Sequence, residues 1–387
     1  MFLAGIIGYG CQIGLEKIAR ISSQINGSEL ENTITWYFSR DNIAEANDKI
    51  LGLMAQLRLP QSYRRHEDQL HTSSDGQKIA VGVDSLNANY SFKYFGQGKG
   101  VSAYTFIDER HFLFHSTVIS SPEKEAAYVI DGLLHNEVVK SDIHSTDTGG
   151  YTEILFGVMR LLGFSYAPRI KNFGTQHRYS FLRRKEYEQQ GYRILPDGYI
   201  NTPLIEEQWD EILRFVATIK LKVTSASQLF KRLNSFSRQH PLYSALKEFG
   251  KIEKSLFLLK WIDLVDLRQA VEKQLNKGEN ANRFADAICF SRNQEFLYAE
   301  KTEQEIADGC NRLIRNAIIC WNYLYLSQVL AEEPDKERRQ ALLAALKNGS
   351  IVIWHHLNLH GEYDFSEEKL QDSVGFDLPR ILAVEVS

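Results

Sequence analysis

The sequence VSAYTFI at residues 101–107 is rich in β-branched and aromatic side chains, and comparable stretches occur at 79–83 and 111–119. Runs of this composition with turns between them predict three strands. Apolar residues then recur at helical spacing over 121–135, a short strand is expected over 142–146, and another helix over 151–162. This order predicts an α/β fold with one mixed sheet flanked by helices.

Helical periodicity dominates on both sides of this region. Residues 11–58 and the chain beyond residue 200 carry apolar residues three or four positions apart, and no strand is expected beyond residue 200. The helices expected there cover 206–219, 225–238, 240–275, 279–290 and 303–332. Gly278 is expected to end one helix, which places Glu279 in the first turn of the next.

The composition is that of a folded protein, with 43% hydrophobic and 24% charged residues. It excludes a disordered or low-complexity chain. The 45 Lys and Arg residues against 49 Asp and Glu give a formal net charge of −4, so a nucleic-acid site would have to be a local patch. The four cysteines form no CxxC pair, which predicts reduced thiols and no structural zinc site.

No apolar run approaches the length that a membrane span needs, and the apolar opening residues lack the basic start of a signal peptide. The sequence therefore predicts a cytoplasmic protein with no membrane partner.

Two short segments place a carboxylate among small and hydroxyl-bearing residues. They are HTSSDGQ at 71–77, near the start of the first strand, and IHSTDTGG at 143–150, at the end of a later strand. Carboxylates on neighbouring strands repel each other unless a cation lies between them or one takes up a proton. Magnesium prefers oxygen ligands and suits such a pair. Each segment alone could equally be a turn or a helix cap.

A third acid, Glu279, follows Gly278 in the segment NKGENAN at 276–282. An acid in the first turn of a helix is ordinarily a favourable partner of the helix dipole. Taken alone, this residue is therefore explained without catalysis.

Taken together, the three acidic segments resemble the motifs of the Tn-three family of replicative transposases. The resemblance continues in order along nearly the whole chain. It includes the stretches 128–134, 161–164, 167–170, 209–214, 252–257, 321–326 and 356–363.

The resemblance implies an RNase H-like catalytic core in which Asp75, Asp147 and Glu279 are catalytic residues and metal ligands. Asp84, which directly follows the apolar stretch at 79–83, is kept as a rival for the first ligand. The family uses two Mg²⁺ (or Mn²⁺) ions, which clamp the attacking and leaving oxygens at phosphorus. Water first frees a 3′-hydroxyl at the transposon end, and this hydroxyl then attacks target DNA.

The interval between Asp147 and Glu279 is too long for a bare RNase H-like sheet, so a helical insertion is expected before the helix of the catalytic glutamate. The predicted domains are a helical N-terminal segment (1–70), the first part of the catalytic core (71–195) and the helical insertion (196–275). The catalytic helix with further helices (276–345) and a C-terminal tail (346–387) complete the division.

Double-stranded DNA, as transposon ends and as target, is the expected partner, and the resemblance suggests a homodimer. Residues 160–193 hold eight basic residues against two acidic ones, interleaved with aromatics. Such a segment can contact phosphates and stack on bases, although a solvated surface is the simpler alternative. The candidate DNA-binding residues are Arg169, Lys171, Arg178, Arg183, Arg184 and Lys185, and association with the bacterial nucleoid would follow.

Two departures from the family pattern leave other functions open. Asp286 stands seven residues after Glu279, where the family usually carries a basic residue, and Met1 falls just before the catalytic part. The chain could therefore be a truncated, catalytically inactive DNA-binding remnant. A stand-alone RNase H-like nuclease, which cuts without joining strands, is a further alternative.

Overall fold

The computed structural model describes residues 1–121, 123–136, 138–148, 151–235, 240–291, 294–371 and 375–384. The chain forms two compact units. Unit 1 comprises Met1–Glu67, Gly76–Glu123 and Lys277–Ser387, and unit 2 comprises Asp68–Asp75 and Lys124–Asn276. The chain passes between the units four times, and two of these crossings lie within an element, one in the strand β2 (His71–Ala80) and one in the helix α13 (Val265–Ile288).

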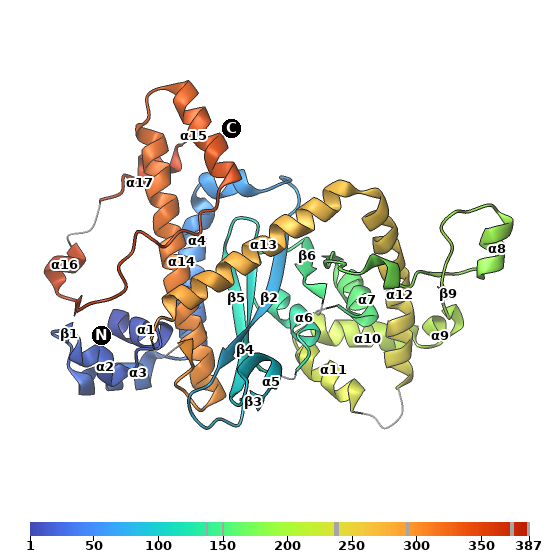
Figure 1. Ribbon diagram of the computed structural model, residues 1–387, viewed down its shortest axis with the longest axis horizontal. Coiled ribbons are helices and arrows are strands. Elements are labelled where there is room, and N and C mark those ends of the chain that lie inside the picture. Colours follow the sequence, from blue (N-terminus) through green and yellow to red (C-terminus); the bar gives the residue numbers. More distant parts are fainter. Residues whose placement is uncertain are drawn as a thin grey trace. The chain divides into compact units, whose positions relative to one another are not determined.

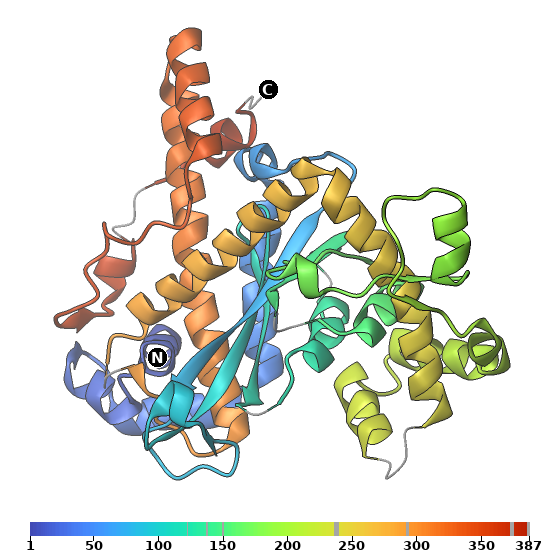
Figure 2. The ribbon, with the colours of Figure 1, turned by 45° about the vertical axis from the view of Figure 1, so that its right-hand side comes forward.

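In the main sheet of unit 1, β4 pairs antiparallel with both β3 and β5. The strand order is β3-β4-β2, and β5 pairs with β4. Asp108, at the end of β4, is fully buried and accepts hydrogen bonds from the backbone N–H groups of Arg110 and Phe112. This side chain therefore builds the turn that joins the two long strands (Figure 2). The strands of this unit besides β2 are β1 (Ser22–Ser23), β3 (Asn89–Tyr90), β4 (Lys99–Asp108), β5 (Leu113–Ser120) and β10 (Tyr363–Asp364).

The long helix α14 (Lys301–Glu332) organises the core of unit 1. It packs on α1, α4 and β5, and Figure 2 shows it beside α4. Asn316 lies buried at this junction and donates to Asn47 Oδ1 at 2.9 Å and to the Leu113 carbonyl at 3.0 Å. The other helices of this unit are α1 (Phe2–Gly10), α2 (Leu15–Arg20), α3 (Gly27–Tyr37), α4 (Arg40–Gln56), η1 (Leu59–Tyr63), α5 (Phe92–Phe95), α15 (Lys336–Asn348), α16 (Glu367–Gln371) and α17 (Leu378–Leu382).

Unit 2 contains a parallel arrangement in the order β2-β6-β7, with helices around it (Figure 1). Its strands besides β2 are β6 (Ile143–Thr146), β7 (Ser165–Tyr166), β8 (Tyr179–Ser180) and β9 (Gly198–Tyr199). Its helices are α6 (Ala126–Leu134), α7 (Glu153–Leu162), η3 (Phe173–Thr175), α8 (Arg184–Gln189), α9 (Thr202–Glu207), α10 (Trp209–Lys220), α11 (Ala226–Asn234) and α12 (Pro241–Asp263).

Two glycines allow α7 and α12 to approach closely. A Cβ atom at Gly250 would lie 1.7 Å from the carbonyl oxygen of Glu153, and one at Gly157 would lie 3.1 Å from the Cα of Gly250. Next to this contact the Lys254 ammonium and the Glu153 carboxylate form an ion pair at 2.9 Å. The helix α12 is therefore fixed against the helix that follows the second acidic motif.

The mixed α/β class with helices around a mixed sheet is confirmed. Three local predictions are wrong. The strand β2 begins at His71, well before the apolar residues that predicted it, because the polar segment 71–74 is buried through pairing with β6. The helix α13 runs unbroken through the buried Gly278, and the break lies at Leu264, whose backbone is extended. Beyond residue 200, the short strand β10 pairs in parallel with β1.

Within the described residues, none of the helices combines the length and the apolar character needed to cross a membrane. The four cysteines are free and buried.

Candidate active site

The register between β2 and β6 places the first two acidic motifs side by side in unit 2. The two strands are parallel, with His71 opposite Ile143 and Ser74 opposite Thr146. Asp75 follows Ser74 and Asp147 follows Thr146, so the two aspartates occupy neighbouring positions on strands spaced about 4.8 Å apart. Side chains alternate along a strand, so Asp75 shares the face of Ser73 in β2, and Asp147, directly after the last residue of β6, follows Ser145 by the same two-residue step.

A buried polar layer supports the opposite face of these strands. His144 lies 2.8 Å from Thr72 Oγ1 through Nδ1 and 2.9 Å from Ser74 Oγ through Nε2. Burial, together with the nearby His71, lowers the pKa of His144 to about 3. The imidazole is therefore neutral at physiological pH, and it connects β2 to β6 immediately before the two aspartates.

The low pKa of His144 predicts a pH dependence of stability. The unfolded chain takes up a proton on this side chain near pH 6.5, whereas the folded protein does so only near pH 3. As the pH is lowered from 6.5 to 3, protonation of His144 in the unfolded chain should therefore reduce the free energy of unfolding by up to about 1.4 kcal/mol per pH unit. Urea unfolding of the wild type and of His144→Gln at several pH values measures this dependence. The variant should show a flatter profile, and equal slopes would contradict the prediction.

Asp147 is held as a carboxylate by its neighbours. Its Oδ1 accepts hydrogen bonds from the Thr148 backbone at 2.6 Å and from Arg169 Nη2 and Nε at 2.8 and 3.2 Å. Partial burial alone would raise the pKa of Asp147, but these hydrogen bonds and the Arg169 charge lower the pKa below its usual value. Asp147 is therefore ionised at neutral pH, and its side chain is 53% exposed.

Arg169 links Asp147 to helix α13. Its Nη1 lies 3.4 Å from the Glu272 carboxylate. Glu272, Glu279 and Asp286 are spaced seven residues apart and therefore share one face of α13, because seven residues nearly complete two helical turns. Glu272 lies in the part of the helix that belongs to unit 2, whereas Glu279 and Asp286 lie in the part that belongs to unit 1.

Two contacts attach α13 to β2, one inside each unit. In unit 2, Ser73 Oγ lies 3.1 Å from Gln274 Nε2, which can donate to it. In unit 1, Gln77 Nε2 donates to the Asp286 carboxylate. The half-buried position of Asp286 raises the pKa of this residue, although the hydrogen bond from Gln77 opposes that effect. Asp286 therefore has a structural partner in this chain, which the sequence did not predict.

The rival first ligand, Asp84, is exposed and lies beyond the end of β2. The two glycines that close the second acidic motif, at positions 149 and 150, lie outside the described residues.

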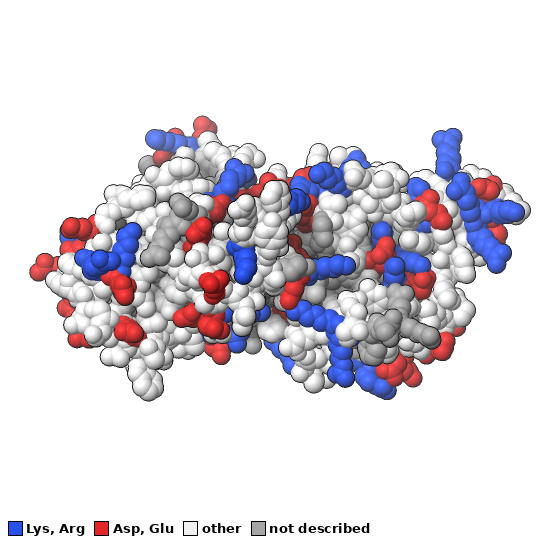
Figure 3. Space-filling model, turned by 60° about the horizontal axis from the view of Figure 1, so that its bottom comes forward, with Lys and Arg blue, Asp and Glu red and all other residues white. Residues whose placement is uncertain are grey.

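The six candidate DNA-binding residues have different surroundings. Arg169 pairs with Asp147, Arg178 with Asp197 at 3.0 Å, and Arg184 with Glu188 at 2.9 Å. Lys171, Arg183 and Lys185 are exposed. In Figure 3, Lys and Arg side chains project at the right-hand end, where Figure 1 places α8. Arg169, which the sequence assigned to DNA, thus contacts a candidate catalytic carboxylate.

The donor set fits a hard divalent cation. Two carboxylates at neighbouring strand positions, one of them ionised, supply the oxygen ligands that Mg²⁺ prefers. In the part of the chain that the structure describes, no group of three or more His, Cys, Asp or Glu side chains is placed to hold a metal ion.

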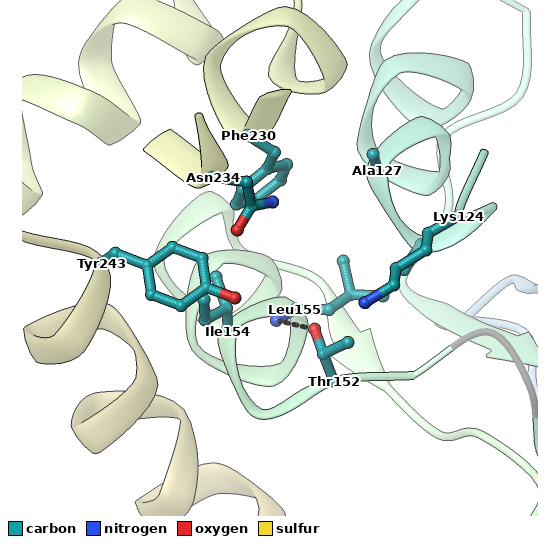
Figure 4. A pocket seen from close by; sticks show the side chains of 9 residues that line it. Lys124, Ala127, Thr152, Ile154, Leu155, Phe230, Asn234 and Tyr243 are labelled. Atoms are coloured by element: carbon teal, nitrogen blue, oxygen red, sulfur yellow. Dashed lines mark hydrogen bonds between the residues drawn. The ribbon is translucent and has the colours of Figure 1, made fainter. Parts of the chain in front are cut away.

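A separate pocket of unit 2 has a different chemistry. Figure 4 shows it between α7, α11 and α12, with the Lys124 ammonium and the Tyr243 hydroxyl directed toward Thr152. The Thr152 hydroxyl caps α7 by accepting the N–H of Leu155 at 3.3 Å. The described lining of this pocket contains no carboxylate.

Comparison with known proteins identifies the family of this chain. The family model described as the Tn3 transposase DDE domain matches residues 1–363. The transposase for transposon Tn1546 of Enterococcus faecium is 34% identical over 371 residues, covering 96% of this chain and 37% of the relative. The transposase for transposon Tn501 of Pseudomonas aeruginosa is 32% identical over 380 residues, covering 95% and 37%.

The fold and the match define a DDE-type catalytic domain. The chain belongs to the Tn3 transposase DDE domain family. It spans little more than a third of the length of these relatives.

Proposed function

We propose that this chain carries the catalytic centre of a replicative DNA transposase, which cleaves DNA at transposon ends and joins the freed 3′-hydroxyl to target DNA. The catalytic and metal-binding residues are Asp75, Asp147 and Glu279. The observation that carries the proposal is the parallel pairing of Ser74 with Thr146, which places two acidic motifs of the family at neighbouring positions.

The contacts between β2 and α13 support Glu279 as the third residue. Ser73 and Gln77 flank Asp75 on one face of β2. Their partners on α13, Gln274 and Asp286, flank Glu279 along the helix. The first contact lies in unit 2 and the second in unit 1, so each unit fixes its own part of β2 to its own part of α13.

The chemistry needs no protein nucleophile. Divalent cations, proposed as two Mg²⁺ or Mn²⁺ ions, would stabilise the charge that develops at phosphorus when bound. The chain's own residues hold the acids in place and keep Asp147 ionised, while Arg169 balances the charge of Asp147. Water is the first attacking group and the 3′-hydroxyl of the DNA is the second, so catalysis rests on positioning and on charge.

The proposed partners are transposon-end and target DNA, bound through exposed members of the basic segment 160–193, and a second copy of the chain in a homodimer. The bacterial relatives support action in the cytoplasm, on DNA of the nucleoid. The predicted domain division, including the helical insertion at 196–275, stays part of this proposal.

A strand-transfer assay tests the function. The 387-residue chain is incubated with Mg²⁺, a plasmid target and the terminal repeats that flank its gene, cut to expose the 3′-hydroxyl. Joined products are expected. Cutting without joining would indicate a nuclease instead, and DNA binding without either reaction would indicate an inactive remnant.

The contact between Gln77 and Asp286 predicts a positioning effect. Asp286→Ala removes the acceptor and should slow cleavage about 10- to 100-fold, because small displacements of reacting groups are costly. Asp286→Asn keeps a carbonyl acceptor for Gln77 and should retain activity within a few-fold of the wild type. Single-turnover cleavage rates measure both variants. Equal losses in the two would show that the charge of Asp286, and not its hydrogen bond, is needed.

A further inference from the structure

One segment of unit 2 carries apolar side chains that are exposed to solvent. We call residues 178–199 the arm, and its tip is residues 181–194. Within the tip every residue except Tyr187 is exposed. Four apolar side chains are among them: Phe181 is 59% exposed, Leu182 43%, Tyr192 57% and Ile194 44%. Exposed apolar side chains that lie together mark an interaction site, and Phe181 and Leu182 are adjacent in the chain.

The neck of the arm is built rigidly. The strands β8 and β9 pair in parallel, and the Arg178 guanidinium bonds Asp197 at 3.0 Å across the neck. The backbone N–H of Tyr179 donates to Ser255 Oγ of α12 at 2.7 Å. The arm is therefore anchored to the long helix α12, beyond which it extends (Figure 1).

The tip has internal structure that leaves Phe181 and Leu182 outside. The rings of Tyr187 and Tyr192 pack at 5.6 Å, and the Tyr187 hydroxyl bonds the Ser180 hydroxyl. Gly191 turns the chain with φ at +77°, a conformation that favours glycine. Phe181 and Leu182 stand between this folded part and the neck, adjacent to three consecutive basic residues.

The charge of the tip indicates an anionic partner. Glu188 forms an ion pair with Arg184 at 2.9 Å, and the Glu186 carboxylate accepts a hydrogen bond from the backbone N–H of Arg183. Among the described residues, no acidic side chain forms an ion pair with Arg183, Lys185 or Arg193. Three exposed cations beside an exposed apolar pair fit duplex DNA, where cations bind phosphates and apolar side chains enter between base pairs.

We propose that the arm is a DNA-distorting wedge: Arg183, Lys185 and Arg193 hold the phosphates of duplex DNA while Phe181 and Leu182 insert between adjacent base pairs and unstack them. The inference rests on the proposed function only in that DNA is the partner. It adds a distortion step that the three acids do not perform.

The test uses the 387-residue chain and 30-base-pair duplexes of random sequence carrying 2-aminopurine, whose fluorescence rises on unstacking. The assay is run at low salt with Ca²⁺, so that binding is measured without cleavage. Phe181→Ala/Leu182→Ala should reduce the fluorescence gain about tenfold at saturating protein, in line with the cost of losing base contacts. Its DNA affinity should fall less than that of Arg183→Ala/Lys185→Ala/Arg193→Ala, whose salt dependence of binding should also weaken.

Leu221→Ala/Val223→Ala is the matched control, because these side chains are exposed by 74% and 73% and also adjoin lysines. It should retain the full fluorescence gain. An unchanged gain in the Phe181/Leu182 variant would overturn the wedge, as would a loss of dimerisation by that variant with unstacking intact. If the wild type bound no duplex at all, the proposed function itself would be wrong. If the wild type unstacked DNA but did not cleave it, the proposed function would be wrong and the wedge would still be supported.

Discussion

Asp147→Asn is expected to abolish metal-dependent cleavage of transposon-end DNA, with a loss of about a thousandfold or more. The amide keeps the shape of the side chain and can still accept hydrogen bonds from Thr148 and Arg169, but it lacks the negative charge that a divalent cation requires. Asp75→Asn and Glu279→Gln should have the same effect for the same reason. The measurement is the single-turnover rate on end-labelled DNA in Mg²⁺ and in Mn²⁺.

Asp84→Asn is the matched control, since it changes the charge of another acid near the end of the same strand. It should cleave like the wild type. Retained cleavage by Asp75→Asn together with a loss in Asp84→Asn would transfer the role of first ligand to Asp84. All four variants should bind DNA, which separates a catalytic defect from a folding defect.

Arg315→Leu should strongly destabilise the core of unit 1. Arg315 is only 1% exposed, and its Nη1 donates to the Ala281 carbonyl at 3.2 Å. Burial lowers the pKa of Arg315 to about 10 and raises the pKa of Asp308, which lies buried on the same helix. Removing this cation leaves Arg312 as the cation that acts on the buried Asp308 carboxyl, and an uncompensated buried charge costs about 3–5 kcal/mol. Urea unfolding measures the change.

The double variant Asp308→Asn/Arg315→Leu should recover part of this loss, because it removes both charges together. Arg338→Leu is the control, since the exposed Arg338 pairs with Glu333 on the surface at 3.2 Å and should change stability by well under about 1 kcal/mol. An Arg315→Leu protein as stable as this control would show that Arg315 does not compensate Asp308.

Much of the sheet could be predicted because its strands carry their own signal. The strands β4 and β5 contain the aromatic and β-branched residues that pack on a sheet face, and both were expected within two residues of their ends. The first half of β2 gives no such signal, since Thr72 and Ser74 are polar and are buried only by pairing with β6 and by bonding His144. Gly278 is likewise tolerated inside α13, because tertiary packing outweighs the cost of about 1 kcal/mol for a helical glycine.

The positions of the acids could be predicted from their motifs, whereas their partners could not. Arg169 has a basic side chain in a basic segment, and only the fold shows that it bonds Asp147. Gln77 belongs to the first acidic motif, but its contact with Asp286 joins residues more than two hundred positions apart. A side chain alone does not reveal such long-range pairs.

The most direct test of the metal centre is a crystal structure of the chain soaked in Mn²⁺, with anomalous scattering used to locate the ion. The proposed metal centre predicts manganese within coordinating distance of carboxylate oxygens of Asp75, Asp147 and Glu279. Manganese held by Asp84 in place of Asp75, or a Glu279 side chain directed away from an ion bound by the two aspartates, would contradict it.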